Sequence, residues 1–206
     1  PQNRLLARGP RFRLSGELIR DHMLKASGKL SAKMFGPGVY PPQPLTVLAH
    51  AFGNKSWNAS KGEDRYRRSV YTFIKRTAPF AGFMTFDGTS GENCLAKRDR
   101  SNTPLQALTL LNDEMFLELA RAVGKEVHLQ KKDPVSTLFR RFLTRPPSPE
   151  ENKVLQAYLN QQVERLSKGE LKPAEIAADK KATPELAGKV LLARAIMNLD
   201  EAITKP

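Results

Sequence analysis

The sequence contains little of what enzymes and extracellular scaffolds use for catalysis or cross-linking. Its 206 residues include one cysteine, Cys94, and three histidines, His22, His50 and His128, which lie far apart in the chain. A single cysteine excludes a disulfide-stapled scaffold, although it leaves an extracytoplasmic location open. No metal-ligand spacing, Gly-rich phosphate loop or Cys-x-x-Cys-His haem attachment sequence is present. We therefore expect no catalytic constellation, no metal site and no cofactor in this chain.

Long hydrophobic runs are also missing. No apolar stretch approaches the roughly 20 residues that a helix needs to cross a bilayer. The chain is 40% hydrophobic and 27% charged, which is typical of a globular protein rather than a disordered one. Its length suits a single domain. The sequence starts without a Met or a targeting segment, so we expect a mature product or a piece of a larger protein.

Acidic residues are scarce in the first half. Residues 1–100 hold 18 Lys and Arg against 7 Asp and Glu, whereas residues 101–206 hold 16 against 14. A basic half can indicate an anionic partner such as nucleic acid, a membrane surface or an acidic polysaccharide. The alternative, which we favour, is that many of these cations pair locally or lie in solvated loops.

A cluster of basic side chains is the best candidate for a binding site. Guanidinium groups can bind carboxylate, sulfate or phosphate through two parallel hydrogen bonds. In the alternative, again favoured, the same residues pair with Asp87, Asp99 and Asp113 and brace loops on a central helix. The candidate polyanion-binding residues are Arg67, Arg68, Lys75, Arg76, Lys97, Arg98 and Arg100.

Two aromatic residues stand in a stretch that is rich in Pro and Gly. Residues 36–44 cannot form a helix because proline recurs there, and we expect little regular structure as far as residue 60. Tyr40 and Trp57 could line a sugar- or peptide-binding surface. In the interpretation that we prefer, Trp57 fills the edge of the core.

The second half carries strong helix signals. Thr103-Pro104 and Gln106 predict a capped helix over residues 104–129, with Leu105, Leu108, Leu111 and Met115 on its inner face. The same cap-plus-proline pattern recurs three times. It predicts helices after Asp133-Pro134, after Ser148-Pro149 with Glu151, and after Thr183-Pro184, together with a short exposed helical piece within residues 168–182.

Signals in the first half are weaker. Ser15 and Gly28 bracket a helix of about a dozen residues, with Leu18 on its inner face. Residues 66–76 could be a helix or a strand, and we choose a helix capped by Asp64. Residues 80–86 read as extended, followed by a turn at Asp87. The predicted fold is mostly α: one irregular helical domain, 1–206, with a basic, loop-rich part (1–100), a helical part (101–206) and at most minor β.

Several motifs, in their order along the chain, resemble a known family. They are Asn3-Arg4-Leu5-Leu6-Ala7-Arg8-Gly9-Pro10-Arg11, Glu17 with Ile19-Arg20-Asp21, Tyr66-Arg67-Arg68-Ser69-Val70-Tyr71-Thr72-Phe73, Lys75-Arg76-Thr77, Thr85-Phe86-Asp87, Asn102-Thr103-Pro104-Leu105-Gln106-Ala107-Leu108, Leu111-Asn112-Asp113, Thr144-Arg145-Pro146-Pro147 and Asn198-Leu199-Asp200-Glu201. The chain resembles the planctomycete-type C-terminal domain of unknown function that follows cytochrome-c-like domains in large secreted proteins.

The resemblance implies an extracytoplasmic, multidomain parent, often in polysaccharide-degrading settings, with any c-type haem elsewhere in that parent. The family's domain has a further upstream half, with an Asn-Arg-Val-Trp-like motif that nothing here matches. We therefore expect upstream domains as partners, or self-association of the isolated chain.

Three functional hypotheses remain. The first is a non-catalytic interaction or scaffold module. The second is a binding module for anionic polysaccharide or another polyanion, which would bind nucleic acid only without sequence preference. The third is part of a polysaccharide-degrading hydrolase with Asp87 as a carboxylate.

Overall fold

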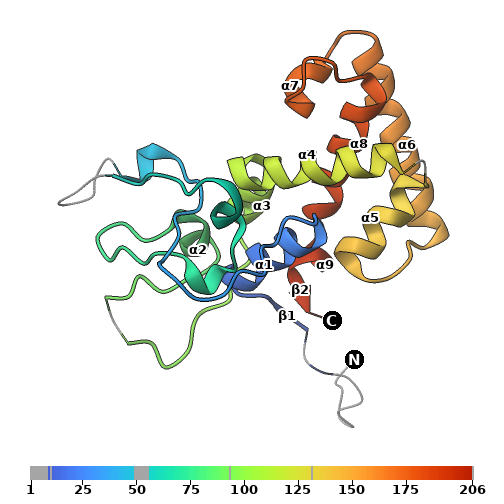
Figure 1. Ribbon diagram of the computed structural model, residues 1–206. Coiled ribbons are helices and arrows are strands. Elements are labelled where there is room, and N and C mark those ends of the chain that lie inside the picture. Colours follow the sequence, from blue (N-terminus) through green and yellow to red (C-terminus); the bar gives the residue numbers. More distant parts are fainter. Residues whose placement is uncertain (1–8, 10, 49–55, 93, 131, 206) are drawn as a thin grey trace.

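The computed structural model describes residues 9, 11–48, 56–92, 94–130 and 132–205. The chain is mostly α-helical, as predicted, with one small sheet among the described residues. The α-helices are α1 (Gly16–Ala26), α2 (Ala81–Thr85), α3 (Pro104–Asn112), α4 (Glu114–Leu129), α5 (Pro134–Leu143), α6 (Pro149–Ser167), α7 (Pro173–Ala177), α8 (Pro184–Met197) and α9 (Asp200–Ile203). Three 3₁₀ turns, η1 (Leu45–Leu48), η2 (Gly62–Tyr66) and η3 (Ser69–Tyr71), lie in the first half (Figure 1).

Helix α8 lies at the centre of the helical half. It contacts α4, α5, α6 and α7, and apolar or small residues cover most of its circumference, as expected for a buried helix (Figure 1). Two glycines allow the closest approaches. A Cβ atom on Gly124 of α4 would lie 2.7 Å from Val190 Cγ2 of α8, and one on Gly188 of α8 would lie 2.6 Å from Val163 Cγ2 of α6.

The predicted caps are confirmed at four helix starts. Ser15, Asp133, Ser148 and Thr183 each accept hydrogen bonds from backbone N–H groups of the first turn. Ser148 and Glu151 form the full capping box, because the Ser148 N–H also donates to Glu151 Oε2 at 2.7 Å. Local sequence therefore determines where these helices begin.

The single helix predicted for residues 104–129 is wrong. The helix is interrupted at Asp113, which has extended backbone angles. Asp113 caps α4 by accepting a hydrogen bond from the Met115 N–H at 2.9 Å. An Asp side chain competes for backbone donors in this way, so it starts a helix more readily than it continues one. The break also turns Leu105 and Leu108 outward, where both are exposed.

The helix predicted for residues 66–76 is wrong as well. Turns η2 and η3 are followed by an extended segment, and Asp64 lies inside η2 rather than capping a helix. Residues 80–86, which we expected to be extended, contain helix α2. These segments take their shape from contacts that are distant in sequence, which are described below.

The two ends of the described chain meet in the sheet. Strand β1 (Phe12–Arg13) pairs antiparallel with β2 (Thr204–Lys205), so that Phe12 lies opposite Lys205. Figure 1 shows this sheet beside α9, below α1. The opening motif, Asn3 to Arg8, and His50 lie outside the described residues.

Candidate functional site: an apolar groove beside helix α1

A surface groove of about 390 Å³ lies where α1, η3 and α2 meet. Its walls come from the first turns of α1, from residues 68–74, from residues 79–83 and from Arg98. The walls are largely apolar: Leu18, Val70, Phe73 and Ile74 all contribute. Leu18, expected on the inner face of its helix, is exposed and lines the groove instead.

Helix α1 holds the segment that forms one wall. The buried Arg20 guanidinium donates to Arg67 O at 2.7 Å, to Arg65 O at 3.1 Å and to Ser69 Oγ at 3.3 Å. The next residue, Asp21, accepts from the Ser69 N–H at 2.7 Å. Burial lowers the pKa of Arg20 to about 10, against an opposing effect of the Asp21 charge, so Arg20 stays protonated at neutral pH.

Residues 68–74, whose backbone is fixed in this way, expose apolar side chains to solvent. Val70 is 72% exposed and Ile74 is 68% exposed. In the helix predicted for residues 66–76, both would lie on one apolar face. Because the segment is not helical, they line the groove instead.

Aromatic rings form the opposite wall. The rings of Phe80 and Phe83 meet edge to face, with centroids 5.0 Å apart, and Trp57 stacks behind Phe80 at 6.1 Å. Trp57 is buried and its indole N–H donates to Pro41 O at 2.7 Å, so it supports this wall and presents no ligand surface. Tyr40 is half-buried and lines a separate hollow with Phe73 and Lys75.

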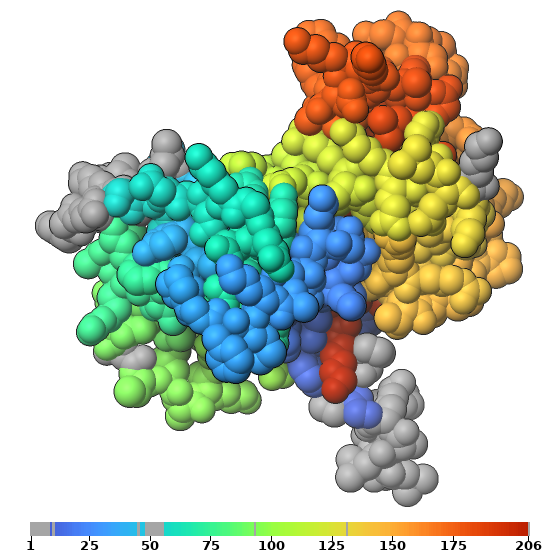
Figure 2. All heavy atoms as spheres, viewed as in Figure 1, coloured from blue at the N-terminus to red at the C-terminus, as the bar shows by residue number. Residues whose placement is uncertain are grey.

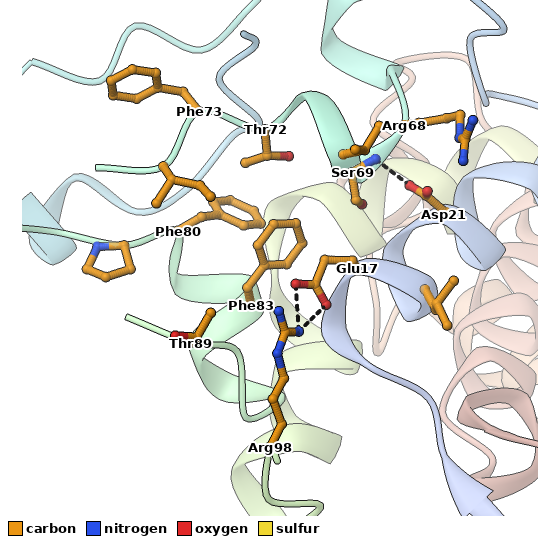
Figure 3. A pocket seen from close by; sticks show the side chains of 14 residues that line it. Glu17, Asp21, Arg68, Ser69, Thr72, Phe73, Phe80, Phe83, Thr89 and Arg98 are labelled. Atoms are coloured by element: carbon orange, nitrogen blue, oxygen red, sulfur yellow. Dashed lines mark hydrogen bonds and ion pairs between the residues drawn. The ribbon is translucent and has the colours of Figure 1, made fainter. Parts of the chain in front are cut away.

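Charged groups mark the rim. Arg98 donates to both oxygens of Glu17, at 2.8 and 3.0 Å, beside the Phe83 ring (Figure 3). Burial would raise the pKa of Glu17, but hydrogen bonds from its own backbone and from Arg98 outweigh that effect and hold the pKa below its usual value. Arg68, at another part of the rim, is exposed and has no hydrogen bond or ion pair with any described residue. Among the described residues that line the groove, Arg68 is therefore the cation that a ligand could pair with.

The seven predicted basic residues do not form one cluster. Arg67 is 1% exposed and binds the carbonyls of Phe35 and Pro37, so it belongs to the interior. Arg98 pairs with Glu17, and Arg100 lies over the Phe12 ring, 4.4 Å from its centroid.

The remaining four are dispersed. Lys75 lines the hollow beside Tyr40, and Lys97 borders a third hollow together with Arg98 and Arg100. Arg68, Arg76 and Lys97 are exposed and form no hydrogen bond or ion pair within the described part of the chain. The two cations that share the groove are Arg68 and Arg98.

Asp87, the carboxylate of the hydrolase hypothesis, is fully engaged. It pairs with Arg13 and accepts hydrogen bonds from the Ser101 N–H at 2.7 Å and from the Ser101 hydroxyl. Burial would raise its pKa, but the bonds from Ser101 and the Arg13 charge outweigh this and lower the pKa. The Asp87 carboxylate therefore stays ionised, and its oxygens are already hydrogen-bonded, so it holds two loops together. The predicted partner of the basic cluster, Asp113, is likewise used as a cap.

The two histidines in the described part of the chain, His22 and His128, contact different helices. His22 Nε2 lies 3.0 Å from Phe142 O, as expected for a hydrogen-bonded core histidine. Within the described ranges, no group of three or more His, Cys, Asp or Glu side chains is placed to hold a metal ion. None of the described helices combines the length and the hydropathy needed to cross a bilayer.

The fold and the groove together define an irregular helical domain that presents one apolar surface hollow between loops. The family model for PSD1, a protein of unknown function (DUF1553), matches residues 1–159, and the chain belongs to this family. The whole groove lies within the matched residues, whereas α7, α8 and α9 lie beyond them. No curated protein and no solved structure matches the chain.

Proposed function

We propose that the chain is a non-catalytic interaction module whose groove docks a protein segment that carries an apolar side chain next to an acidic one. The observation that carries this proposal is the exposed apolar wall formed by Val70, Phe73 and Ile74 beside the unpaired Arg68. Large apolar side chains gathered around one hollow, with a charged rim, are typical of interaction sites. An acidic residue in the partner would complement Arg68.

The build of the groove supports docking rather than chemistry. Its two acids are already engaged, Glu17 with Arg98 and Asp21 with the Ser69 N–H. Arg20 already holds the wall of the groove in place, so the backbone would lose little conformational entropy on binding. Among the described residues, the groove therefore offers shape, apolar area and one cation without a partner, while both of its acids are engaged.

The setting of the module is also part of the proposal. The family resemblance supports an extracytoplasmic, multidomain parent protein in which upstream domains supply the docked segment. Any c-type haem of such a parent would be bound by another domain.

Peptide display against the purified chain tests the docking function. We expect selected peptides to pair an aromatic or aliphatic residue with Asp or Glu, and to lose binding to a Val70→Asp variant. Leu129→Asp is the matched control, because Leu129 is also highly exposed but lies at the end of α4, outside the groove. Selection of peptides that bind both variants equally would contradict the proposal.

A second candidate function is weak binding of anionic polysaccharide. It is favoured by three exposed cations, Arg68, Arg76 and Lys97, which have no partner among the residues that the structure describes. Replacing these three by Gln should lower retention on a sulfated resin, and retention should fall with salt, as for any electrostatic association. Nucleic acid should bind with the same salt dependence and no sequence preference. Retention that is insensitive to salt would exclude this function.

A further inference from the structure

The loop of residues 31–38 displays a phenylalanine to solvent. Phe35 is 78% exposed and its neighbour Met34 is 56% exposed. The backbone of Phe35 has φ +60°, in the left-handed region that bulky residues rarely occupy. Such an outlier persists only where its surroundings hold it, and it motivates a search for function.

The interior holds this loop tip firmly. The buried Arg67 guanidinium donates to Phe35 O and, at 3.1 Å, to Pro37 O, and it lies over the Tyr71 ring, 3.8 Å from the centroid. The Tyr71 hydroxyl accepts the Phe35 N–H at 2.9 Å. A buried cation and a tyrosine therefore fix a strained loop whose aromatic ring contacts little of its own chain. This arrangement is a preorganised anchor.

Acidic side chains flank the anchor. Glu63 Oε1 accepts from the Ser31 hydroxyl at 2.7 Å, and Asp64 pairs with Lys33 at 2.8 Å, at the base of the same loop. Asp64 also lies 4.0 Å from Arg67, so two cations offset its charge, whereas Glu63 accepts from a neutral hydroxyl and keeps its charge. The chain thus carries, on its own surface, an apolar projection on a loop whose base holds the acidic Glu63. This is the chemistry that the groove beside α1 is proposed to accept.

We propose that Phe35 of one molecule inserts into the groove of a second copy of the chain, with Glu63 of the first molecule near Arg68 of the second. This inference rests on the proposed docking function. The groove, of about 390 Å³, has room for an aromatic ring, and the edges and faces of Phe80 and Phe83 suit one. Arg68, which has no ion-pair partner among the described residues, and Glu63 at the base of the loop provide the charge complementarity.

The contact is heterologous, since tip and groove are different surfaces. Each molecule in a pair keeps one free tip and one free groove, so further copies can add unless the arrangement closes into a ring. A contact built on a single anchor buries far less than the roughly 1,200 Å² of a stable interface, so the association is weak.

Sedimentation equilibrium on two surface variants tests the proposal. Phe35→Asn removes the ring and keeps a residue that readily adopts the left-handed conformation. Val70→Asp places a charge in the groove. We expect the average mass of the wild-type chain to rise with concentration. Each variant alone should associate at least about 10-fold more weakly, as for loss of an anchor residue, and should therefore stay monomeric at concentrations where the wild-type chain associates.

The decisive measurement is the equimolar mixture of the two variants. It contains one intact groove, on Phe35→Asn, and one intact tip, on Val70→Asp, so it should form dimers and nothing larger. Leu129→Asn, an exposed apolar change far from both surfaces, should associate as the wild-type chain does. Melting temperatures establish that each variant is folded.

A wild-type chain that stays monomeric up to millimolar concentration, or a mixture that stays monomeric while the wild-type chain associates, would overturn the proposal. Peptide display on Phe35→Asn separates this failure from failure of the docking function. If that variant selects groove-binding peptides while the wild-type chain never self-associates, docking stands and the groove serves another protein. Sedimentation of the chain with anionic lipid vesicles, lost in Phe35→Asn, would instead assign the tip to a lipid surface and overturn self-association.

Discussion

Two buried arginines, Arg20 and Arg67, shape the first half of the molecule. Both guanidinium groups donate to backbone carbonyls of irregular segments that are joined by isolated β-bridges rather than by ladders: Arg20 to Arg65 and Arg67, and Arg67 to Phe35 and Pro37. Buried carbonyls without partners would cost free energy, so these side chains replace a sheet or a helix as the source of hydrogen bonds. Positive charge in this half therefore has a structural use as well as a surface one.

Arg20→Met should destabilise the fold strongly. It removes the donor to two carbonyls and the Ser69 hydroxyl, leaving buried acceptors unsatisfied at a cost of about 3 kcal/mol. Chemical denaturation measures this, with the exposed Arg68→Met as control, expected to change stability by less than about 0.5 kcal/mol. Equal effects of the two substitutions would show that Arg20 is dispensable as a brace.

Asp87→Asn should weaken the fold in a pH-dependent way. The pKa of Asp87 is lowered in the folded state, so its charge stabilises the fold above the unfolded pKa, and that contribution disappears as the pH falls through the folded pKa. We expect a loss of about 1 kcal/mol at pH 7, which shrinks in acid, by thermal melts across pH. Asp99→Asn, in the exposed loop nearby, serves as control. A constant difference at all pH values would mean that the charge of Asp87 is not what matters.

At the scale of elements, helices in the second half were predictable because their signals are local. Ser148 with Glu151, and Asp133 and Thr183 before proline, determine their helix starts within four residues. The break at Asp113 was missed because the apolar spacing continues across it. In the first half, the cap of α1 at Ser15 was predictable, but η2 and η3 were not, since they depend on Arg20, more than forty residues earlier in the chain.

The groove was missed for a similar reason. Arg67 and Arg68 are adjacent and identical in type, yet one is buried under the loop tip and the other is the free cation of the groove. No local pattern distinguishes them. The sequence does show that Val70, Phe73 and Ile74 are apolar. The predicted helix, however, placed them together on one helix face rather than in the wall of a groove. Arg68 and Arg98 were among the predicted binding residues, but the groove and its apolar walls were not predicted.

Gly124→Ala should destabilise the packing of α4 against α8. Alanine favours a helix by about 1 kcal/mol over glycine, but here its Cβ would lie 2.7 Å from Val190 Cγ2 and 3.0 Å from Val190 Cα. Overpacking against backbone atoms costs about 1–3 kcal/mol, so we expect a net loss by chemical denaturation. Asn160→Ala, on the exposed face of α6, gives the effect of alanine without a clash. A stabilised Gly124→Ala variant would mean that the helices separate freely.

At the scale of the whole molecule, we expect the chain to unfold in acid because protonation breaks the ion pairs of Arg145. Arg145 joins α6 to α9 by binding Glu151 and Glu201, each at 2.7 Å. Hydrogen bonding to Arg145, and then to the Ser148 N–H, lowers the pKa of Glu151 from 4.5 to about 2. A lowered folded-state pKa stabilises the fold above pH 4.5, and that stabilisation is lost as the pH falls towards 2.

Arg145→Gln should therefore raise the pH at which the chain unfolds in acid, followed by far-UV circular dichroism. Lys172→Gln, which removes an exposed ion pair with Glu175, is the control and should leave that pH unchanged. If both variants unfold at the wild-type pH, the connection between α6 and α9 does not limit stability in acid.

The pairing of β1 with β2 also determines how the molecule responds to mechanical load. Because Phe12 lies opposite Lys205, the outer ends of the two strands lie at the same end of the sheet. A force that pulls these two ends apart breaks the backbone hydrogen bonds between the strands one after another. The first connections to break would be the Arg11–Asp200 ion pair, at 2.6 Å, and this two-residue ladder. Helices α4 and α8 lie beyond that point and would bear force only after it. A tethered chain would thus yield first at its ends, with the groove beside α1 still in shape.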